Sequence, residues 1–99
     1  MRKTARKGKI TASSGNVFAD LGFDSAEAQV MAMRTDLMIA LEKTIKARGM
    51  TQNAAAGVLG VSQARVSDLM RHRTEKFSLD MLLVFSAKLG KPARLQLAA

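Results

Sequence analysis

The sequence lacks cysteine, tryptophan and tyrosine, and it contains a single histidine and a single proline. Without cysteine the chain can form neither disulfides nor thiolate metal sites, and one histidine is too few for a structural zinc site. No apolar run is long enough to span a bilayer, and no apolar segment follows the basic N-terminus as in a secretory signal. We therefore expect a cytoplasmic protein that is not bound to a membrane and carries no metal or cofactor.

The residue combinations that support catalysis are also missing. The sequence shows no paired carboxylates, no cysteine–histidine pair and no glycine-rich phosphate loop between suitable elements. The lone His72 has no partners for catalysis or metal binding, and we expect it at the surface or against phosphate. The sequence therefore predicts that the protein is not an enzyme.

Helix-forming residues and positive charge are what the chain has in excess. Its 99 residues suffice for one small domain, and seven methionines with many leucines and alanines favour an all-α bundle of about five helices. The net charge of +8 favours a polyanionic partner. The first nine residues include five basic residues and no acidic one. Acidic residues outnumber basic ones over residues 10–42, and basic residues dominate again from Lys43 onward.

The segment 51–71, TQNAAAGVLGVSQARVSDLMR, predicts two short helices joined by a tight turn. Thr51 is a good N-cap for a helix from Gln52 to about Leu59, and Ser62 for a helix from Gln63 to about Arg71. Gly60 supplies the left-handed turn between them. An ordinary helical hairpin is the alternative.

The apolar positions of this segment favour a helix-turn-helix over that hairpin. Ala55, Ala56 and Leu59 share one helical face, and Val66 and Leu69 share another. Small Ala56 allows two helices to cross closely, and Val61 fills the space between them. A steep pair of this kind places its second helix in the DNA major groove.

The pattern TQ-x-x-AA-x-x-L-G-V-S-Q-x-x-V-S-x-L resembles the Cro/phage-repressor (XRE) class of helix-turn-helix proteins, over roughly residues 37–89. Together with its flanks, GNVFADLG and FSLDMLL, it is similar to small antitoxins encoded beside RelE-like toxins. The resemblance implies a lambda-repressor-like fold and a nucleoid-associated protein of bacterial or phage origin. It also implies an antitoxin that represses its own operon and neutralises a ribosome-dependent RNA-cutting toxin.

The first residues of the second helix are the predicted base readers. The Gln63 amide can pair with adenine, and Ala64 can contact a thymine methyl. In the phage repressors, the positions matching Gln63, Ala64 and Asp68 face bases, and that of Gln52 contacts phosphate. Asp68 departs from the usual residue there, and it either accepts from a cytosine amine or pairs with Arg65 or Arg71. The full predicted DNA-binding set is Gln52, Ser62, Gln63, Ala64, Arg65, Ser67, Asp68, Arg71, Arg73 and Lys76.

Residues 1–16 are predicted to form a flexible basic tail, which in one hypothesis reaches DNA. The DNA-binding domain is predicted to span residues 17–99. VFADLGF, residues 17–23, is an apolar patch that either closes over the core or docks on a partner protein. A long helix follows over residues 24–48, whole or split near Met33. Its N-terminus is capped by Asp24 and Glu27. Its apolar stripe is Val30, Met33, Leu37, Leu41 and Ile45.

A last helix is predicted from Leu79 to Leu89, capped by Ser78 and closed by Gly90. It carries two apolar stripes and so needs two partners. We expect the second stripe, Met81, Val84 and Phe85, to form a homodimer interface. The alternation over residues 93–97 indicates a short C-terminal strand, which pairs across a dimer or with a partner's sheet edge, or a frayed tail.

These features favour a sequence-specific repressor that binds operator DNA as a homodimer and acts as an antitoxin. Two alternatives stay open. One is a prophage-type repressor without a toxin. The other is a protein–protein adaptor that neutralises a toxin with little DNA binding.

Overall fold

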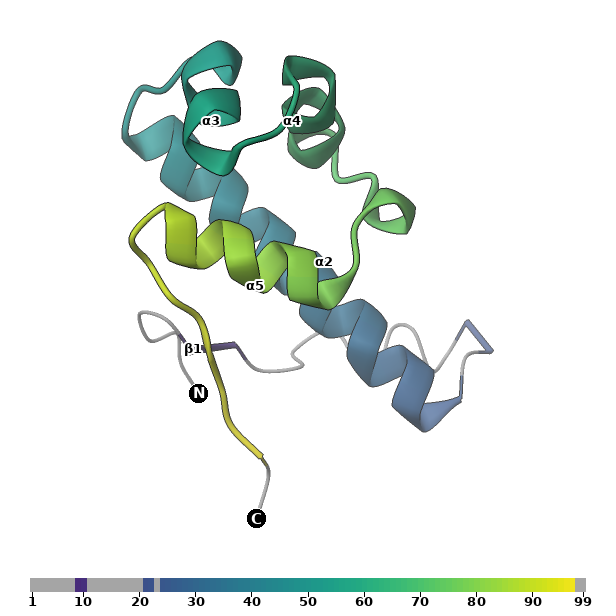
Figure 1. Ribbon diagram of the computed structural model, residues 1–99. Helices are drawn as coiled ribbons and strands as arrows, with labels where there is room; N and C mark the ends of the chain where they lie inside the picture. Colours follow the sequence, from purple (N-terminus) through teal and green to yellow (C-terminus); the bar gives the residue numbers. More distant parts are fainter. Residues whose placement is uncertain (1–8, 11–20, 23, 98–99) are drawn as a thin grey trace.

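The computed structural model of the protein describes residues 9–10, 21–22 and 24–97. In order, the elements are β1 (Lys9–Ile10), α2 (Ser25–Ala47), α3 (Gln52–Leu59), α4 (Gln63–Met70), the 3-10 helix η1 (Thr74–Lys76), α5 (Leu79–Lys88) and β2 (Arg94–Leu95) (Figure 1). The fold is mostly helical, but the described residues form four α-helices, not the predicted five or so. One reason is that α2 runs unbroken for 23 residues, so it is not split near Met33.

All four α-helices begin at a side chain whose oxygen accepts a hydrogen bond from the backbone amide three residues later. These N-caps are Asp24, Thr51, Ser62 and Ser78, with bonds of 2.9, 3.0, 3.1 and 3.3 Å. Each was predicted from the sequence. Because the first amides of a helix have no partner within it, such a cap contributes about 1 kcal/mol to stability.

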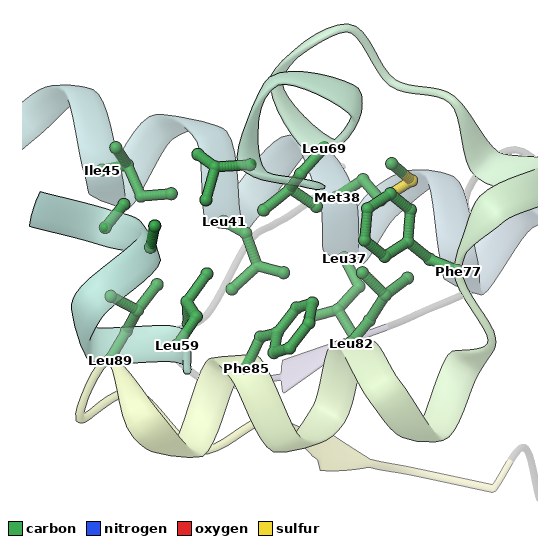
Figure 2. Packing of buried hydrophobic residues seen from close by; sticks show 13 residues of the cluster. Leu37, Met38, Leu41, Ile45, Leu59, Leu69, Phe77, Leu82, Phe85 and Leu89 are labelled. Carbon is green, nitrogen blue, oxygen red and sulfur yellow. The ribbon is translucent and has the colours of Figure 1, made fainter. Parts of the chain in front are cut away.

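The core lies where the C-terminal half of α2 meets the other helices. Leu41 of α2 points into a cluster that Leu59, Leu69 and Phe85 approach from α3, α4 and α5 (Figure 2). The predicted stripe on α2 is correct for Leu37, Leu41 and Ile45, which are buried, while Met33 is half-buried. It is wrong for Val30, which is 44% exposed. The N-terminal turns of α2, where Val30 lies, extend past α5 (Figure 1).

Helix α5 buries more of its surface inside the chain than the sequence predicted, since part of its second apolar stripe also packs in the core. Phe85 is only 5% exposed and points into the core with Leu82 (Figure 2). Its ring meets that of Phe77 edge-on, with centroids 6.1 Å apart. Phe85 is therefore a core residue, which corrects its assignment to a dimer interface. Met81 is half-buried against the same core, and Val84, 50% exposed, faces outward.

The predicted C-terminal strand is present but is shorter than residues 93–97. Strand β2 pairs in parallel with β1, with Lys9 opposite Arg94 and Ile10 opposite Leu95. Its partner at these positions thus belongs to the same chain, whereas the sequence suggested pairing across a dimer or with a partner's sheet edge. The other residues of the predicted tail, and all of the apolar patch 17–23 except Leu21 and Gly22, lie outside the described residues.

Candidate nucleic-acid interface

Helices α3 and α4 form the predicted helix-turn-helix, and the turn between them is fixed by backbone contacts. The Ala56 carbonyl accepts hydrogen bonds from the amides of Gly60 and Val61 at 2.8 and 3.1 Å. Gly60 has φ of 71°, the left-handed conformation that glycine adopts without strain. Lys88 of α5 donates to the Leu59 carbonyl at 3.2 Å, which satisfies an end group of α3. The bounds of both helices agree with the sequence prediction to within one residue.

Burial orients this motif with one face inward and one outward. Ala55, Ala56 and Leu59 of α3 are buried, as are Val66 and Leu69 of α4, as the sequence predicted. Val61 is half-buried against the same core. The first turn of α4 is left facing solvent, and Figure 1 shows α3 and α4 side by side at one end of the molecule. A helix held in this way can enter the major groove by its N-terminal end.

The exposed end of α4 carries only neutral side chains. Ser62, Gln63 and Ala64 are all exposed. The Gln63 side-chain nitrogen lies 3.5 Å from the Gln52 side-chain oxygen, a long hydrogen bond that links the starts of α4 and α3. Because one amide group has two donor hydrogens and an acceptor oxygen, Gln63 keeps a donor and an acceptor for a base edge. The Ser62 hydroxyl accepts from the Arg65 amide, so its own proton remains available to donate.

Further along α4 the side chains turn away from solvent. The Arg65 guanidinium lies over the Phe77 ring, 5.1 Å from its centroid, and Arg65 and Ser67 are both half-buried. A guanidinium over an aromatic face is held by cation–π attraction while its outer edge can still donate hydrogen bonds. The structure therefore sets Arg65 and Ser67 back from the tip that Gln63 and Ala64 occupy.

Asp68 forms ion pairs, but not with the partners expected from the sequence. Its two carboxylate oxygens lie 3.7 Å from Arg73 Nε and 3.6 Å from Lys76 Nζ, and its side chain is 23% exposed. The expected partners, Arg65 and Arg71, are corrected: Arg65 lies over Phe77, and Arg71 is an exposed residue at the end of α4. Arg73 and Lys76 are themselves exposed, so this cluster sits where a phosphate can reach it.

After α4 the chain turns at His72, whose backbone is left-handed. Its φ of 58° is the one positive value among the non-glycine residues that the structure describes. The His72 ring is exposed, as expected, and its Nε2 lies 2.5 Å from Glu42 Oε1 of α2, a contact that the sequence did not predict. Lys46 donates to the other Glu42 oxygen at 2.7 Å. The hydrogen bond from Lys46, and then that with His72, lowers the pKa of Glu42 below its usual value.

Sequence reasoning missed Arg34, which supports this region from α2. Its Nη1 donates to the backbone carbonyls of Thr74 and Phe77 at 3.3 and 3.2 Å. One signal was available, since Arg34 is the single basic residue between positions 10 and 42. A lone cation on an otherwise acidic and apolar stretch calls for a partner elsewhere in the chain.

The described residues hold no cluster of histidine and acidic side chains able to bind a metal ion. Within the same part of the chain, none of the helices combines the length and the apolar character needed to traverse a membrane. Arg71, Arg73 and Lys76 give this end of the molecule positive charge, and Asp68 and Glu75 offset part of it.

Comparison with known proteins agrees with this geometry. A family model described as a helix-turn-helix domain matches residues 17–97. No curated protein and no solved structure shows significant similarity to the chain. The family match supports a DNA-binding regulator, with double-stranded DNA as its partner, and not an enzyme. Since the match spans most of the sequence and includes the four α-helices that the structure describes, the chain belongs to this family of helix-turn-helix domains.

Proposed function

We propose that the protein is a sequence-specific transcriptional repressor of the XRE type, with α4 as its recognition helix. The observation that carries this proposal is the exposed start of α4. There the Gln63 side chain donates one long hydrogen bond to Gln52 and keeps a donor and an acceptor for a base edge. A glutamine there can pair with adenine N6 and N7, and Ala64 can pack on a thymine methyl. In this proposal, Gln52 and Ser62 donate hydrogen bonds to phosphates at the groove edge.

The cations beyond α4 supply the part of the affinity that does not depend on sequence. Arg71, Arg73 and Lys76 are exposed next to the recognition helix. Each one that neutralises a phosphate on binding releases condensed counterions, so affinity falls as salt rises. Residues 17–99 form the DNA-binding domain in this proposal, and the basic residues of positions 1–16 add contacts to the duplex.

A selection from random duplexes tests this proposal, because the protein itself picks out the operator sequence. Enriched sequences are then titrated with the protein at several salt concentrations. We expect one preferred site, bound with a Kd of about 10⁻⁸ M or tighter and at least about 10³-fold above random DNA. If no sequence is enriched and binding to every duplex is weak and insensitive to salt, the protein is not a DNA-binding repressor.

We further propose that the repressor acts as a homodimer through the outer face of α5. After Phe85 is assigned to the core, the half-buried Met81 and Val84 are the remaining candidates, and Val84 is 50% exposed. A two-fold dimer presents two α4 helices to half-sites about one turn of DNA apart, so the selected site should be an inverted repeat. Val84→Lys should then convert a dimer to a monomer in analytical ultracentrifugation. Val58→Lys is the matched control, because Val58 is 45% exposed but lies on α3.

The finer proposal is that this repressor is an antitoxin paired with a RelE-like toxin. Its support is the resemblance of GNVFADLG and FSLDMLL to such antitoxins. The test is to express the adjoining reading frame alone and together with this chain. Arrest of growth that is relieved by co-expression is the expected result. A harmless neighbour would leave a repressor of the prophage type, without a toxin.

A further inference from the structure

We propose that Arg34 is a positioning residue for DNA binding: from α2 it fixes the turn after the recognition helix, and so places Arg73 and Lys76 for phosphate contact. The inference rests on the proposed function of α4. It assigns a role to a residue that lies outside the helix-turn-helix.

The first step is the geometry of the Arg34 contacts. One nitrogen, Nη1, reaches two carbonyls that lie three residues apart, at 3.3 Å for Thr74 and 3.2 Å for Phe77. Thr74 is the first residue of η1, the 3-10 turn between α4 and α5, and Phe77 directly follows its last residue (Figure 1). Arg34 therefore holds both ends of the turn from one point on the long helix α2.

The second step is the environment of the guanidinium. The two hydrogen bonds are partly buried, and the Arg34 Nε is buried without an acceptor among the described residues. Burying a charged group with an unpaired donor costs free energy, and an apolar side chain at this position would avoid that cost. The two bonds to the turn offset part of this cost, so the placement of Arg34 is tied to the turn that it contacts.

The third step is what the turn carries. Arg73 directly precedes η1 and Lys76 is its last residue, and both lie within 3.7 Å of Asp68 on α4. Phe77 follows, and its ring supports the Arg65 guanidinium. Exposed ion pairs such as those of Asp68 hold a loop only weakly. Without the Arg34 bonds, the two cations would keep their charge, but only the buried Phe77 and these weak ion pairs would hold their turn beside α4.

The experiment compares the full-length chain with Arg34→Gln and Arg34→Lys on the duplex selected for the wild-type protein. Thermal unfolding of each variant first fixes a temperature at which it is fully folded. We expect Arg34→Gln to weaken binding by about tenfold and to make the slope of log K against log salt shallower by about one to two. Base preference should not change, because Gln63 and Ala64 lie at the start of α4 and the turn follows its other end. Lys43→Gln is the control for loss of a positive charge, since Lys43 is exposed elsewhere on α2.

A double-variant comparison separates positioning from general stability. In a chain that already carries Arg73→Gln and Lys76→Gln, Arg34→Gln should cause little further loss of affinity, because the groups it positions are gone. Arg34→Lys keeps the charge and supplies an ammonium that can donate to a carbonyl, and it should restore part of the salt slope. It also serves if Arg34→Gln fails to fold.

The outcomes that overturn the inference differ from those that overturn the proposed function. If folded Arg34 variants bind with the wild-type affinity and salt slope, or lose only stability, Arg34 does not position the turn. The same holds if their effect adds fully to the loss of Arg73 and Lys76. If the wild-type chain binds no duplex at all, it is the proposed function that fails.

Discussion

The two ends of the recognition helix differ in chemistry. At the start of α4, Ser62, Gln63 and Ala64 are uncharged and exposed. Past its end, Arg73 and Lys76 are charged and held by Asp68. Uncharged donors and acceptors distinguish bases, whereas positive charge binds any phosphate. The first end is thus suited to choosing the sequence and the second to supplying affinity, so substitutions at the two ends should change different measured quantities.

The largest expected effect follows from removing the residue that joins the charged end to the core. Phe77 is 2% exposed, packs edge-on against Phe85 and supports Arg65. Phe77→Ala should lower the free energy of unfolding by about 3–5 kcal/mol, because it removes a large buried side chain and leaves a cavity. Urea denaturation measures this change.

The control for that measurement is Val58→Ala, since Val58 is an apolar residue that is 45% exposed and lies on α3, outside the proposed dimer interface. Its expected cost is within about 0.5 kcal/mol. A loss below about 1 kcal/mol for Phe77→Ala would mean that the turn is not anchored to the core as the structure indicates.

At the neutral end, Gln63→Ala should weaken binding to the selected duplex by about 1–3 kcal/mol and relax the preference at one base pair. The salt slope should stay the same, because no charge is lost. Titrations against duplexes with single base-pair changes measure both quantities. Gln96→Ala, an exposed glutamine outside the motif, is the control. A change in salt slope with an unaltered base preference would reverse the roles assigned to the two ends.

The neutral end was also the part of the structure that the sequence predicted best. Thr51, Gly60 and Ser62 act within a few residues of themselves, through caps and a left-handed turn, so short-range rules suffice for them. The buried faces of α3 and α4 follow from helical spacing in the same way. The base contacts of Gln63 and Ala64 stay predictions, since they concern a partner molecule.

The charged end was predicted poorly because its contacts depend on how the chain folds back. Helical spacing offered Arg65 and Arg71 as partners for Asp68. The actual partners lie beyond α4, and they reach Asp68 after the reversal at His72, where φ is 58°. No rule of spacing predicts a left-handed histidine. Arg34 was missed for the same reason, since it is about forty residues away from the carbonyls it binds.

Phe85 shows a different limit of sequence reasoning. The two apolar stripes of α5 predict one face against the core and a second face against another copy of the chain. The edge-on contact with Phe77, which belongs to the segment between η1 and α5, gives the second stripe a partner inside the chain. A pattern of apolar residues indicates how much of a helix is covered, but it does not say whether the covering element belongs to the same chain or to another.

Smaller effects should follow from releasing the charged end. Asp68→Asn removes an acid that neutralises Arg73 and Lys76 and that repels phosphate itself. We expect affinity for random DNA to rise by about 0.5–1 kcal/mol, in the range typical of exposed ion pairs. Affinity for the selected site should rise less if Asp68 accepts from a cytosine there, so the ratio of the two affinities falls.

Competition of labelled specific duplex with unlabelled random duplex measures that ratio directly. Glu75→Gln is the matched control, because Glu75 is an exposed acidic residue in η1, next to Lys76. An equal gain from both substitutions would mean that only net charge matters and that the Asp68 ion pairs have no special role.

The smallest effect is expected behind this end, at the contact that joins α2 to His72. The pKa of Glu42 lies below its usual value of about 4.5, owing first to the hydrogen bond from Lys46 and then to that with His72. Since the folded state lowers this pKa, Glu42 stabilises the fold above pH 4.5, and the contribution is lost as the pH falls through the lowered value. Glu42→Gln should therefore lose less stability than the wild-type protein as the pH falls below about 4.5.

Thermal unfolding of both proteins across this pH range measures the difference. Glu27→Gln is a suitable control, since its backbone amide can still donate to the Asp24 cap of α2 while an exposed carboxyl on the same helix is removed. DNA binding at neutral pH should be close to that of the wild type for Glu42→Gln, because Glu42 itself contacts His72 and not the cations on the turn. If the wild type and Glu42→Gln lost stability equally on acidification, the contact between Glu42 and His72 would not help to hold the charged end against α2, and Arg34 and Phe77 would be left to hold it.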